Sequence, residues 1–406
     1  MLALLLSVSA VLFGPQPPAA ALAGQPSANQ LSVTQSPASQ LPANQPPTSQ
    51  SVHLLPVPDG VGMPGLLSQP YGGQTGLVAH DQLMPLGAEQ AWRYATGAGV
   101  VVAVLDSGVD ANHPDLAGRV LPGHDYVDGS TDGRVDPVGH GTTVASLIAG
   151  SGELTTGLAP AATILPVRVL DENNRYEHAA TVAAGVIWAV DHGADVINLS
   201  LGGQRDSQAL AEALAYAMAN DVVVVACTGN LVNGGTTEVW YPAREPGVIA
   251  VAGLSVTDGE FSSWPSSLTG PQTVLAAPAV VTGAQAGGGY RNVQGTSFSS
   301  ALVAGAAALV RSRWPELSAG DVVHRLVVTA DDLSGAGRSH EYGYGAVDPV
   351  AALTESLPHI PVNPLDTKAR HGSAGFGTAP DIPGVAAPAE LALPGTPIRV
   401  SQSPSG

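Results

Sequence analysis

The stretch VVVAVLDSGVD, residues 100–110, indicates the fold class of this chain. Its apolar part is continuous rather than alternating, which is typical of a parallel strand buried on both faces of a sheet. The run ends at Asp106, so a carboxylate stands where the strand leaves the core. Ligands of open parallel sheets bind beyond the carboxyl ends of the strands. We therefore expect chemistry at this edge of the sheet.

Strand and helix signals alternate through the middle of the chain in the same way. This alternation predicts an α/β domain of three layers, a mostly parallel sheet covered by helices on both faces. The expected strands span residues 100–105, 163–169, 194–199, 221–227 and 247–253, and the expected helices span 141–149, 177–191, 207–219, 298–313 and 319–329.

The composition of the 406 residues bounds the function. Charged residues make up 12% of the chain, about half the usual share, and the net charge is −18. A nucleic acid or an anionic membrane is therefore not expected as the main partner. The acidity favours solubility outside the cell.

Four segments are predicted along the chain. Residues 1–23 resemble a secretory signal peptide with cleavage after Ala21-Leu22-Ala23, although the first basic residue is Arg93, which suggests a start codon further upstream. Residues 24–87 are expected to be disordered or extended, 88–356 to form one large folded domain, and 357–406 to form a Pro-rich disordered tail. No apolar stretch of the tail reaches the ~20 residues that a spanning helix needs.

Metal and cofactor signals are weak. The single cysteine, Cys227, excludes an intrachain disulfide and is expected to be a buried, inert thiol. The chain contains no His-Glu-x-x-His, no phosphate-binding loop and no dinucleotide fingerprint after a strand, so no cofactor is predicted. An acidic loop leaves calcium as an alternative to a solvated loop; its carboxylates are Asp125, Asp128, Asp132 and Asp136.

Three motifs supply an acid, a base and a nucleophile. Asp106 can orient an imidazole, His140 in GHGT can act as general base, and Ser297 in GTSFSSA can attack. Each residue has an ordinary structural alternative: a turn for the first two and a helix N-cap for Ser297. Ser299 and Ser300 are neighbouring competitors for the role of nucleophile. The combination and its order along the chain favour catalysis.

A fourth residue completes the predicted site. Asn230 ends VVVVACTGN, where its side-chain amide could stabilise an oxyanion, although Gly-Asn is also a common turn pair. The backbone N–H of Ser297 would be the second donor.

With these motifs the chain resembles subtilisin-family serine proteases over about residues 88–356, helped by VINLSLGG at 196–203 and GYGAVDP at 343–349. The resemblance implies a serine endopeptidase that forms an acyl-enzyme on Ser297. It also implies that Ser200, Leu201, Gly202 and Gly203 bind the substrate backbone and border the specificity pocket. An α/β-hydrolase esterase is excluded because no Gly-x-Ser-x-Gly occurs. The family's usual proline after the nucleophile motif is Ala301 here.

Within the family, GAEQAWRYATGAGVVVAVLDSGVD at 87–110 and GYGAVDPVAAL at 343–353 are most similar to mycosins, proteases of type VII secretion. This similarity implies export to the cell envelope or beyond, peptide or protein substrates, and type VII secretion machinery as partner. Mycosins normally have disulfides and a C-terminal membrane helix, and the sequence predicts neither here. A scaffold that stabilises a secretion complex, with catalysis dispensable, is the alternative.

Overall fold

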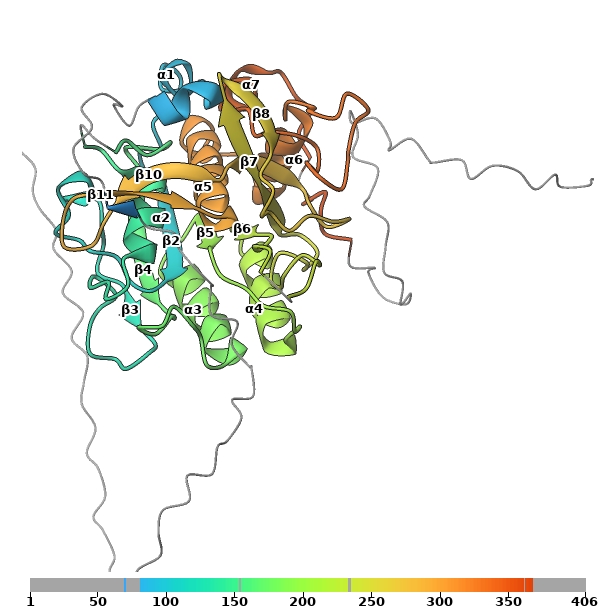
Figure 1. The fold of residues 1–406 in the computed structure, drawn as a ribbon. Helices are drawn as coiled ribbons and strands as arrows, with labels where there is room; N and C mark the ends of the chain where they lie inside the picture. Colours follow the sequence, from blue (N-terminus) through green and yellow to red (C-terminus); the bar gives the residue numbers. More distant parts are fainter. Residues whose placement is uncertain (1–68, 71–80, 153–154, 233–234, 361, 368–406) are drawn as a thin grey trace, which may run out of the picture. The chain divides into compact units, whose positions relative to one another are not determined.

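A mostly parallel sheet forms the centre of the part of the chain that the structure describes (Figure 1). The computed structural model describes residues 69–70, 81–152, 155–232, 235–360 and 362–367. All of them lie in one compact unit. The strand order is β3-β4-β2-β5-β6-β7-β8, with β9 also paired to β7. Only β8 runs antiparallel among these described strands.

Strands β2, β4, β5, β6 and β7 follow the predicted apolar runs, whereas β3, β8 and β9 lie outside the predicted strands. Their bounds are β2 Val101–Asp106, β3 His124–Asp125, β4 Thr163–Arg168, β5 Val196–Leu199, β6 Val223–Cys227, β7 Ile249–Thr257, β8 Glu260–Ser263 and β9 Leu275–Pro278. The central strands are buried along their length, as continuous apolar runs predict.

Helices cover both faces of the sheet. Successive side chains of a strand point to opposite faces, and in β2 Asp106 contacts α2 (His140–Ala149). Leu105 instead lies against Gly185 of α3 (Ala179–Asp191). Helix α5 (Thr296–Arg313) packs with α2, and α4 (Gln208–Ala219) packs with α3. The predicted three-layer α/β fold is confirmed.

A small antiparallel sheet leads into α5. Strand β11 (Tyr290–Gln294) lies between β1 (Gln69–Pro70) and β10 (Val280–Ala284). One residue, Gly295, separates β11 from the first residue of α5. This sheet therefore sets where the helix that carries Ser297 begins.

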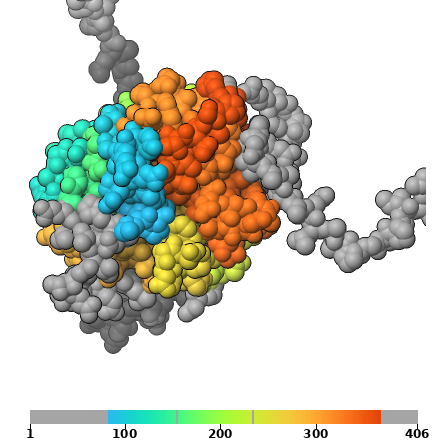
Figure 2. All heavy atoms as spheres, turned by 90° about the horizontal axis from the view of Figure 1, so that it is seen from above, coloured from blue at the N-terminus to red at the C-terminus, as the bar shows by residue number. Residues whose placement is uncertain are grey.

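The core extends beyond the predicted boundaries of the catalytic domain. Leu83 and Leu86 of the 3-10 helix η1 (Asp81–Leu86) are buried in it, as is Leu365, so the core begins before residue 88 and ends after 356. Helix α1 (Ala88–Ala91) packs against α7 (Pro349–Thr354), so an early and a late helix of the described core lie side by side (Figure 2). A shorter helix, η2 (Pro114–Leu116), and α6 (Ala319–Val328) complete the fold.

The predicted signal peptide, residues 1–23, and almost all of the segments 24–80 and 368–406 lie outside the described residues. Among the residues that are described, no helix combines the length and the apolar character needed to cross a membrane.

Candidate active site

Three strand ends meet at one edge of the sheet. Strands β2, β5 and β6 are parallel neighbours, so their carboxyl ends lie at the same edge. Asp106 is the last residue of β2, Ser200 follows β5, and Asn230 comes three residues after β6. Three of the predicted site residues, Asp106, Ser200 and Asn230, therefore lie at the edge of the sheet where the sequence predicted the site.

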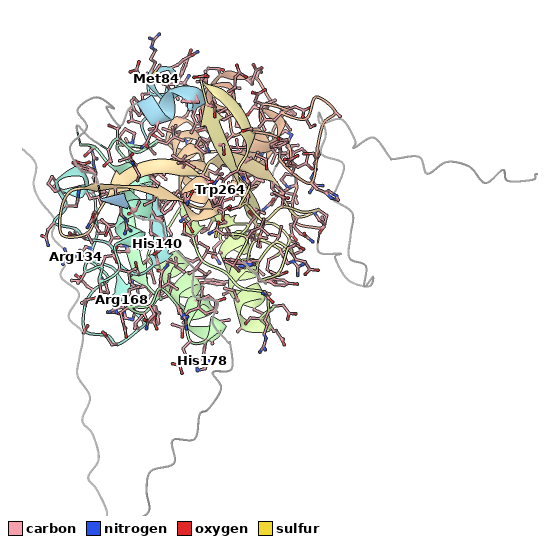
Figure 3. The ribbon with its side chains drawn as sticks, in the orientation of Figure 1. Met84, Arg134, His140, Arg168, His178 and Trp264 are labelled. Atoms are coloured by element: carbon pink, nitrogen blue, oxygen red, sulfur yellow. The ribbon has the colours of Figure 1, made fainter. Side chains whose placement is uncertain are left out.

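Asp106 and His140 form a buried hydrogen-bonded pair. The Nδ1 atom of His140 lies 2.7 Å from Oδ1 of Asp106, and both residues are 0% exposed. Because a carboxylate only accepts, Nδ1–H donates, which leaves Nε2 as the unprotonated nitrogen of the neutral ring. Nε2 is buried and has no hydrogen-bond partner among the described residues. Figure 3 shows His140 at the centre of the fold, where α2 begins.

Ser297 lies in the first turn of α5, one residue after its start. Gly295 is the N-cap, so the sequence-based alternative that Ser297 caps this helix is wrong. The Phe298 ring lies 5.6 Å from the His140 ring, centroid to centroid, which brings the starts of α5 and α2 together. Ser297 Oγ is 3.3 Å from the carbonyl oxygen of Ser200. The nucleophile candidate and the base candidate thus lie in adjoining first turns.

The competing serines make other hydrogen bonds. Ser299 Oγ donates to the carbonyl oxygen of Pro278 at 3.2 Å, and Ser300 Oγ donates to that of Ser297 at 2.9 Å. Both side chains are buried and their hydroxyls stabilise backbone.

Asn230 is held in one orientation by Thr296. Its Oδ1 accepts from both the backbone N–H and the hydroxyl of Thr296, each at 3.0 Å. The other end of the amide, Nδ2, faces Gly295 and lies 3.5 Å from where a Cβ would stand there. A preorganised donor is therefore directed at the start of α5, next to Ser297.

Asp136 organises the turn that carries His140, a role the sequence analysis missed. Its Oδ1 accepts from Ser107 Oγ at 2.8 Å and from the N–H groups of Val138 and Gly139. Its Oδ2 accepts from the N–H and the hydroxyl of Thr142. A carboxylate at the N-terminus of α2 also complements the helix dipole.

The four acidic residues of the loop that suggested calcium do not gather at one point, although Asp125 and Asp128 share Arg168. Asp125 accepts from Arg168 at 2.9 Å and from Thr131 at 2.8 Å, and Asp132 pairs with Arg134 at 2.6 Å. Asp136 instead accepts from the N–H of Gly139, the residue before His140. Across the described ranges no group of three His, Cys, Asp or Glu side chains could hold a metal ion. Figure 3 shows Arg134 and Arg168 away from His140.

Arg291 is a second residue that the sequence did not reveal. It lies on β11, and its Nη2 donates to the carbonyl oxygen of Gly139 at 2.7 Å and to Thr143 Oγ1 at 3.2 Å. Burial lowers the pKa of Arg291 from its ordinary value. Its guanidinium ties the small sheet to the turn before His140, a contact that no local sequence pattern predicts.

The predicted substrate segment is partly used by the protein itself. Ser200 Oγ donates to the carbonyl oxygen of Ser297 at 2.7 Å, so this side chain supports the nucleophile turn. The side chain of Leu201 is buried in the core. Gly203 exchanges two backbone hydrogen bonds with Tyr241, at 2.9 and 2.8 Å. Gly202 lies between these tied residues.

Comparison with known proteins supports one family. The subtilase family profile matches residues 97–345. Subtilisin DY from Bacillus licheniformis is 38% identical over 263 residues, which cover 63% of this chain and 91% of the relative. Fervidolysin from Fervidobacterium pennivorans is 37% identical over 301 residues, which cover 66% of this chain but only 43% of fervidolysin.

Solved structures agree with these sequence relatives. The MycP3 protease from the type VII (ESX-3) secretion system has a TM-score of 0.62 and 33% identity, over 70% of this chain and 90% of that one. MycP1 from Mycobacterium smegmatis has a TM-score of 0.66 and 28% identity, over 77% and 94% of the two chains. The similarity to mycosins found in the sequence is thus also a similarity of fold.

Proposed function

Because this chain belongs to the subtilase family of serine endopeptidases, we propose that it cleaves peptide bonds with Ser297 as nucleophile, His140 as base and Asp106 as the group that orients His140. The buried 2.7 Å bond between Asp106 and His140 carries the proposal. It leaves Nε2 of His140 unprotonated at the adjoining start of α5, where a base for Ser297 is required.

The proposed reaction has two halves. In the first, Nε2 takes the proton of Ser297 Oγ as the oxygen attacks the peptide carbonyl, and then gives that proton to the leaving amine. In the second, water attacks the acyl-enzyme with the same base and Ser297 is regenerated. Asp106 stabilises the imidazolium in both halves without taking its proton.

The negative oxygen that forms in each half needs a donor. Asn230 Nδ2 is proposed as one, since Thr296 holds the amide oxygen away from the substrate. The N–H of Ser297, in the first turn of α5, is proposed as the second, because first-turn amides have no acceptor within their own helix. The positive end of the α5 dipole adds to this stabilisation.

A fluorophosphonate probe tests this assignment, because it reacts with an activated serine. Purified protein should be labelled at Ser297, and Ser297→Ala should abolish the labelling. Ser299→Ala is the matched control and should be labelled like the wild type. Labelling that persists in Ser297→Ala, or a wild type that is not labelled, would contradict the assignment.

We further propose the cell envelope as the setting and type VII secretion as the process that this peptidase serves. The support is the likeness to the MycP3 and MycP1 proteases of such systems. Comparing a gene deletion with Ser297→Ala tests the link. Loss of secretion in both strains supports an obligatory protease, loss only in the deletion supports the scaffold alternative, and normal secretion in both contradicts the link.

A further inference from the structure

Arg291 places a positive charge at the N-terminal turn of α2. Its Nη2 donates to the carbonyl oxygen of Gly139, the N-cap of that helix, at 2.7 Å. Its Nε and Nη2 also donate to Thr143 Oγ1 in the first turn, at 3.3 and 3.2 Å. The N-terminal end of a helix dipole favours anions, so a cation at this turn is unfavourable for the helix itself. The charge therefore needs an explanation other than helix stability.

The small sheet brings Arg291 to this position. Across the sheet, Arg291 pairs with Gly283 of β10. A Cβ at Gly283 would come within 2.4 Å of Thr143 Cγ2, so the absence of a side chain lets β10 lie close to α2. The hydroxyl of Thr143 also lies 2.8 Å from the carbonyl oxygen of Ala284 on β10. Arg291 thus reaches α2 across a strand that is held against the same helix.

Asp136 and Arg291 hold the two peptide groups of Gly139. Asp136 Oδ1 accepts from the N–H of Gly139 at 2.7 Å, and Arg291 donates to its carbonyl oxygen. That carbonyl belongs to the peptide bond that joins Gly139 to His140. Gly139 has a φ of 85°, and glycine has more backbone freedom than any other residue. The two contacts therefore fix the backbone from which the His140 side chain extends.

Arg291 also balances the charge around His140. Asp106 and Asp136 are buried carboxylates, 0% and 7% exposed. Burial lowers the pKa of Arg291, and the charges of Asp136 and Asp106 oppose that effect, so the one cation interacts with both carboxylates. When His140 takes a proton, the two carboxylates stabilise the imidazolium and the guanidinium opposes it.

The other charged or titratable groups on the described elements that pack against α2, and at the turns beside them, have partners of their own. They are Arg168 with Asp125 and Asp128, Asp115 with Tyr290, His113 with the Gly289 carbonyl, Asp110 with the Gly287 N–H, Arg311 with Asp221, and Arg313 with the rings of Tyr94 and Trp314. The thiol of Cys227 has a pKa raised by burial to about 12, so it is neutral in the range in which His140 titrates.

We propose that Arg291 is a positioning residue of the peptidase reaction: it fixes His140 through the Gly139 carbonyl, and its charge offsets one carboxylate so that His140 remains neutral under mildly acidic conditions. The inference rests on the proposed function, since it needs His140 as the base for Ser297. A base must be unprotonated to take a proton. Arg291 therefore extends the activity of the site to lower pH.

The test follows the rate at which the fluorophosphonate labels Ser297 between about pH 5 and 9. The rate should rise with pH as His140 loses its proton and should then reach a plateau. Arg291→Gln keeps an N–H donor and removes the charge. The midpoint of its rise should move upward by about 0.5 pH units, which is roughly a threefold lower rate relative to the plateau on the acid side. Arg291→Lys should keep the wild-type midpoint with a several-fold lower plateau, because an ammonium lacks the fork that holds both partners.

Two further variants give the sign and the background. Asp136→Asn removes a negative charge from the same turn, so its midpoint should move downward, opposite to that of Arg291→Gln. Arg134→Gln is the matched control, because this arginine pairs with Asp132 in the loop before α2 and is 42% exposed. Its midpoint and plateau should equal those of the wild type.

Labelling also separates the two ways to fail. A wild type that is not labelled at any pH contradicts the proposed function itself. With a labelled wild type, an Arg291→Gln variant whose plateau falls while its midpoint stays in place has lost only structure, and this result overturns the role of the charge. If Arg291→Gln does not fold, the other two variants decide. A midpoint that moves in Arg291→Lys, or that stays in place in Asp136→Asn, overturns the proposal.

Discussion

At the scale of single residues, the orientation of Asn230 is the feature on which oxyanion stabilisation depends. Asn230→Ala removes the proposed donor while leaving the pair Asp106 and His140 intact. We expect kcat to fall about 10²- to 10³-fold, the loss known for removing one such donor in the relative subtilisin, with KM little changed. Steady-state kinetics on one peptide measures both values.

Thr296→Val is the companion variant, because it deletes the hydroxyl that donates to Asn230 Oδ1 and keeps the backbone donor. Its kcat should fall less than that of Asn230→Ala. An Asn230→Ala enzyme with wild-type kcat would remove Asn230 from the mechanism.

Asp136 is a positioning residue, since it acts on His140 through the turn between them. Asp136→Asn exchanges one accepting oxygen for an NH2 donor, so the variant loses either the acceptor of the Thr142 bonds at Oδ2 or the acceptor of the Ser107 bond at Oδ1. We expect a loss of about 2–3 kcal/mol in the free energy of unfolding, because hydrogen bonds to a charged group are worth about that much. Urea denaturation measures it.

A purely structural role for Asp136 would leave the kinetics of the folded variant unchanged. We expect instead a lower kcat at unchanged KM in conditions where the variant is fully folded. Asp128→Asn is the matched control: this exposed carboxylate of the same loop accepts from Arg168 at 3.3 Å, and its replacement should leave kcat unaltered.

Cys227 is confirmed as a buried free thiol. Burial raises its pKa from 9.0 to about 12. Because the unfolded thiol ionises at a lower pH than the folded one, its contribution to the free energy of unfolding should be fully present below about pH 9. That contribution should be lost as the pH rises from 9 to about 12. Cys227→Ala should show a smaller decrease over that window in denaturant titrations. An identical pH profile in the two proteins would contradict the raised pKa.

At the scale of elements, α6 shows how one carboxylate sets a helix start. Asp321 and Ser318 form a capping box, and Asp321 also accepts from the N–H of Ile360 and pairs with His359 at 2.8 Å. Against the opposing effect of burial, these hydrogen bonds, that from Ser318 foremost, hold the pKa of Asp321 below its ordinary value of 3.8. Its contribution to stability is therefore present above pH 3.8 and is lost as pH falls through the lower folded pKa.

Asp321→Ala should destabilise the protein at pH 7 by about 1–2 kcal/mol, as loss of a helix cap does. Thermal unfolding followed by circular dichroism measures the loss. The difference from wild type should shrink on acidification below the ordinary carboxyl pKa. A difference that is independent of pH would show that packing, not charge, makes the contribution.

At the scale of the whole molecule, one core joins residues far apart in sequence. It includes Leu83 before α1 and Leu365 after α7, both outside the domain predicted from sequence. Leu83→Ala should lower the free energy of unfolding by about 2–5 kcal/mol, the usual result of emptying a buried leucine site. Urea unfolding should remain a single transition by fluorescence and circular dichroism. Two separate transitions would show that the η1 segment unfolds by itself.

Much of this fold was predictable because its strands are buried on both faces. Continuous apolar runs such as residues 100–105 then mark strands whatever their neighbours are, and the predicted helices agree with α2 to α6 within two residues. The sequence predicted the start of α5 two residues late, at 298 instead of Thr296, because the small and polar residues of GTSFSS are typical of a turn. With the helix start predicted at 298, Ser297 stood in the N-cap position, whereas in the structure it lies in the first turn.

The sequence by itself determined the parallel strands β2, β4, β5, β6 and β7 and the helices α2 to α6. It also determined the residue types at or just after strand ends, Asp106 and Asn230, and at helix starts, His140 and Ser297, since these depend on local patterns. Only the tertiary structure decided that Asp136 supports the turn before His140, that Thr296 orients Asn230, and that Arg291 ties the small sheet to that same turn. The last two contacts join segments that are far apart in the chain, and no local sequence pattern predicts which of them meet. Their geometry exists only once the parallel sheet has brought its carboxyl ends to one edge.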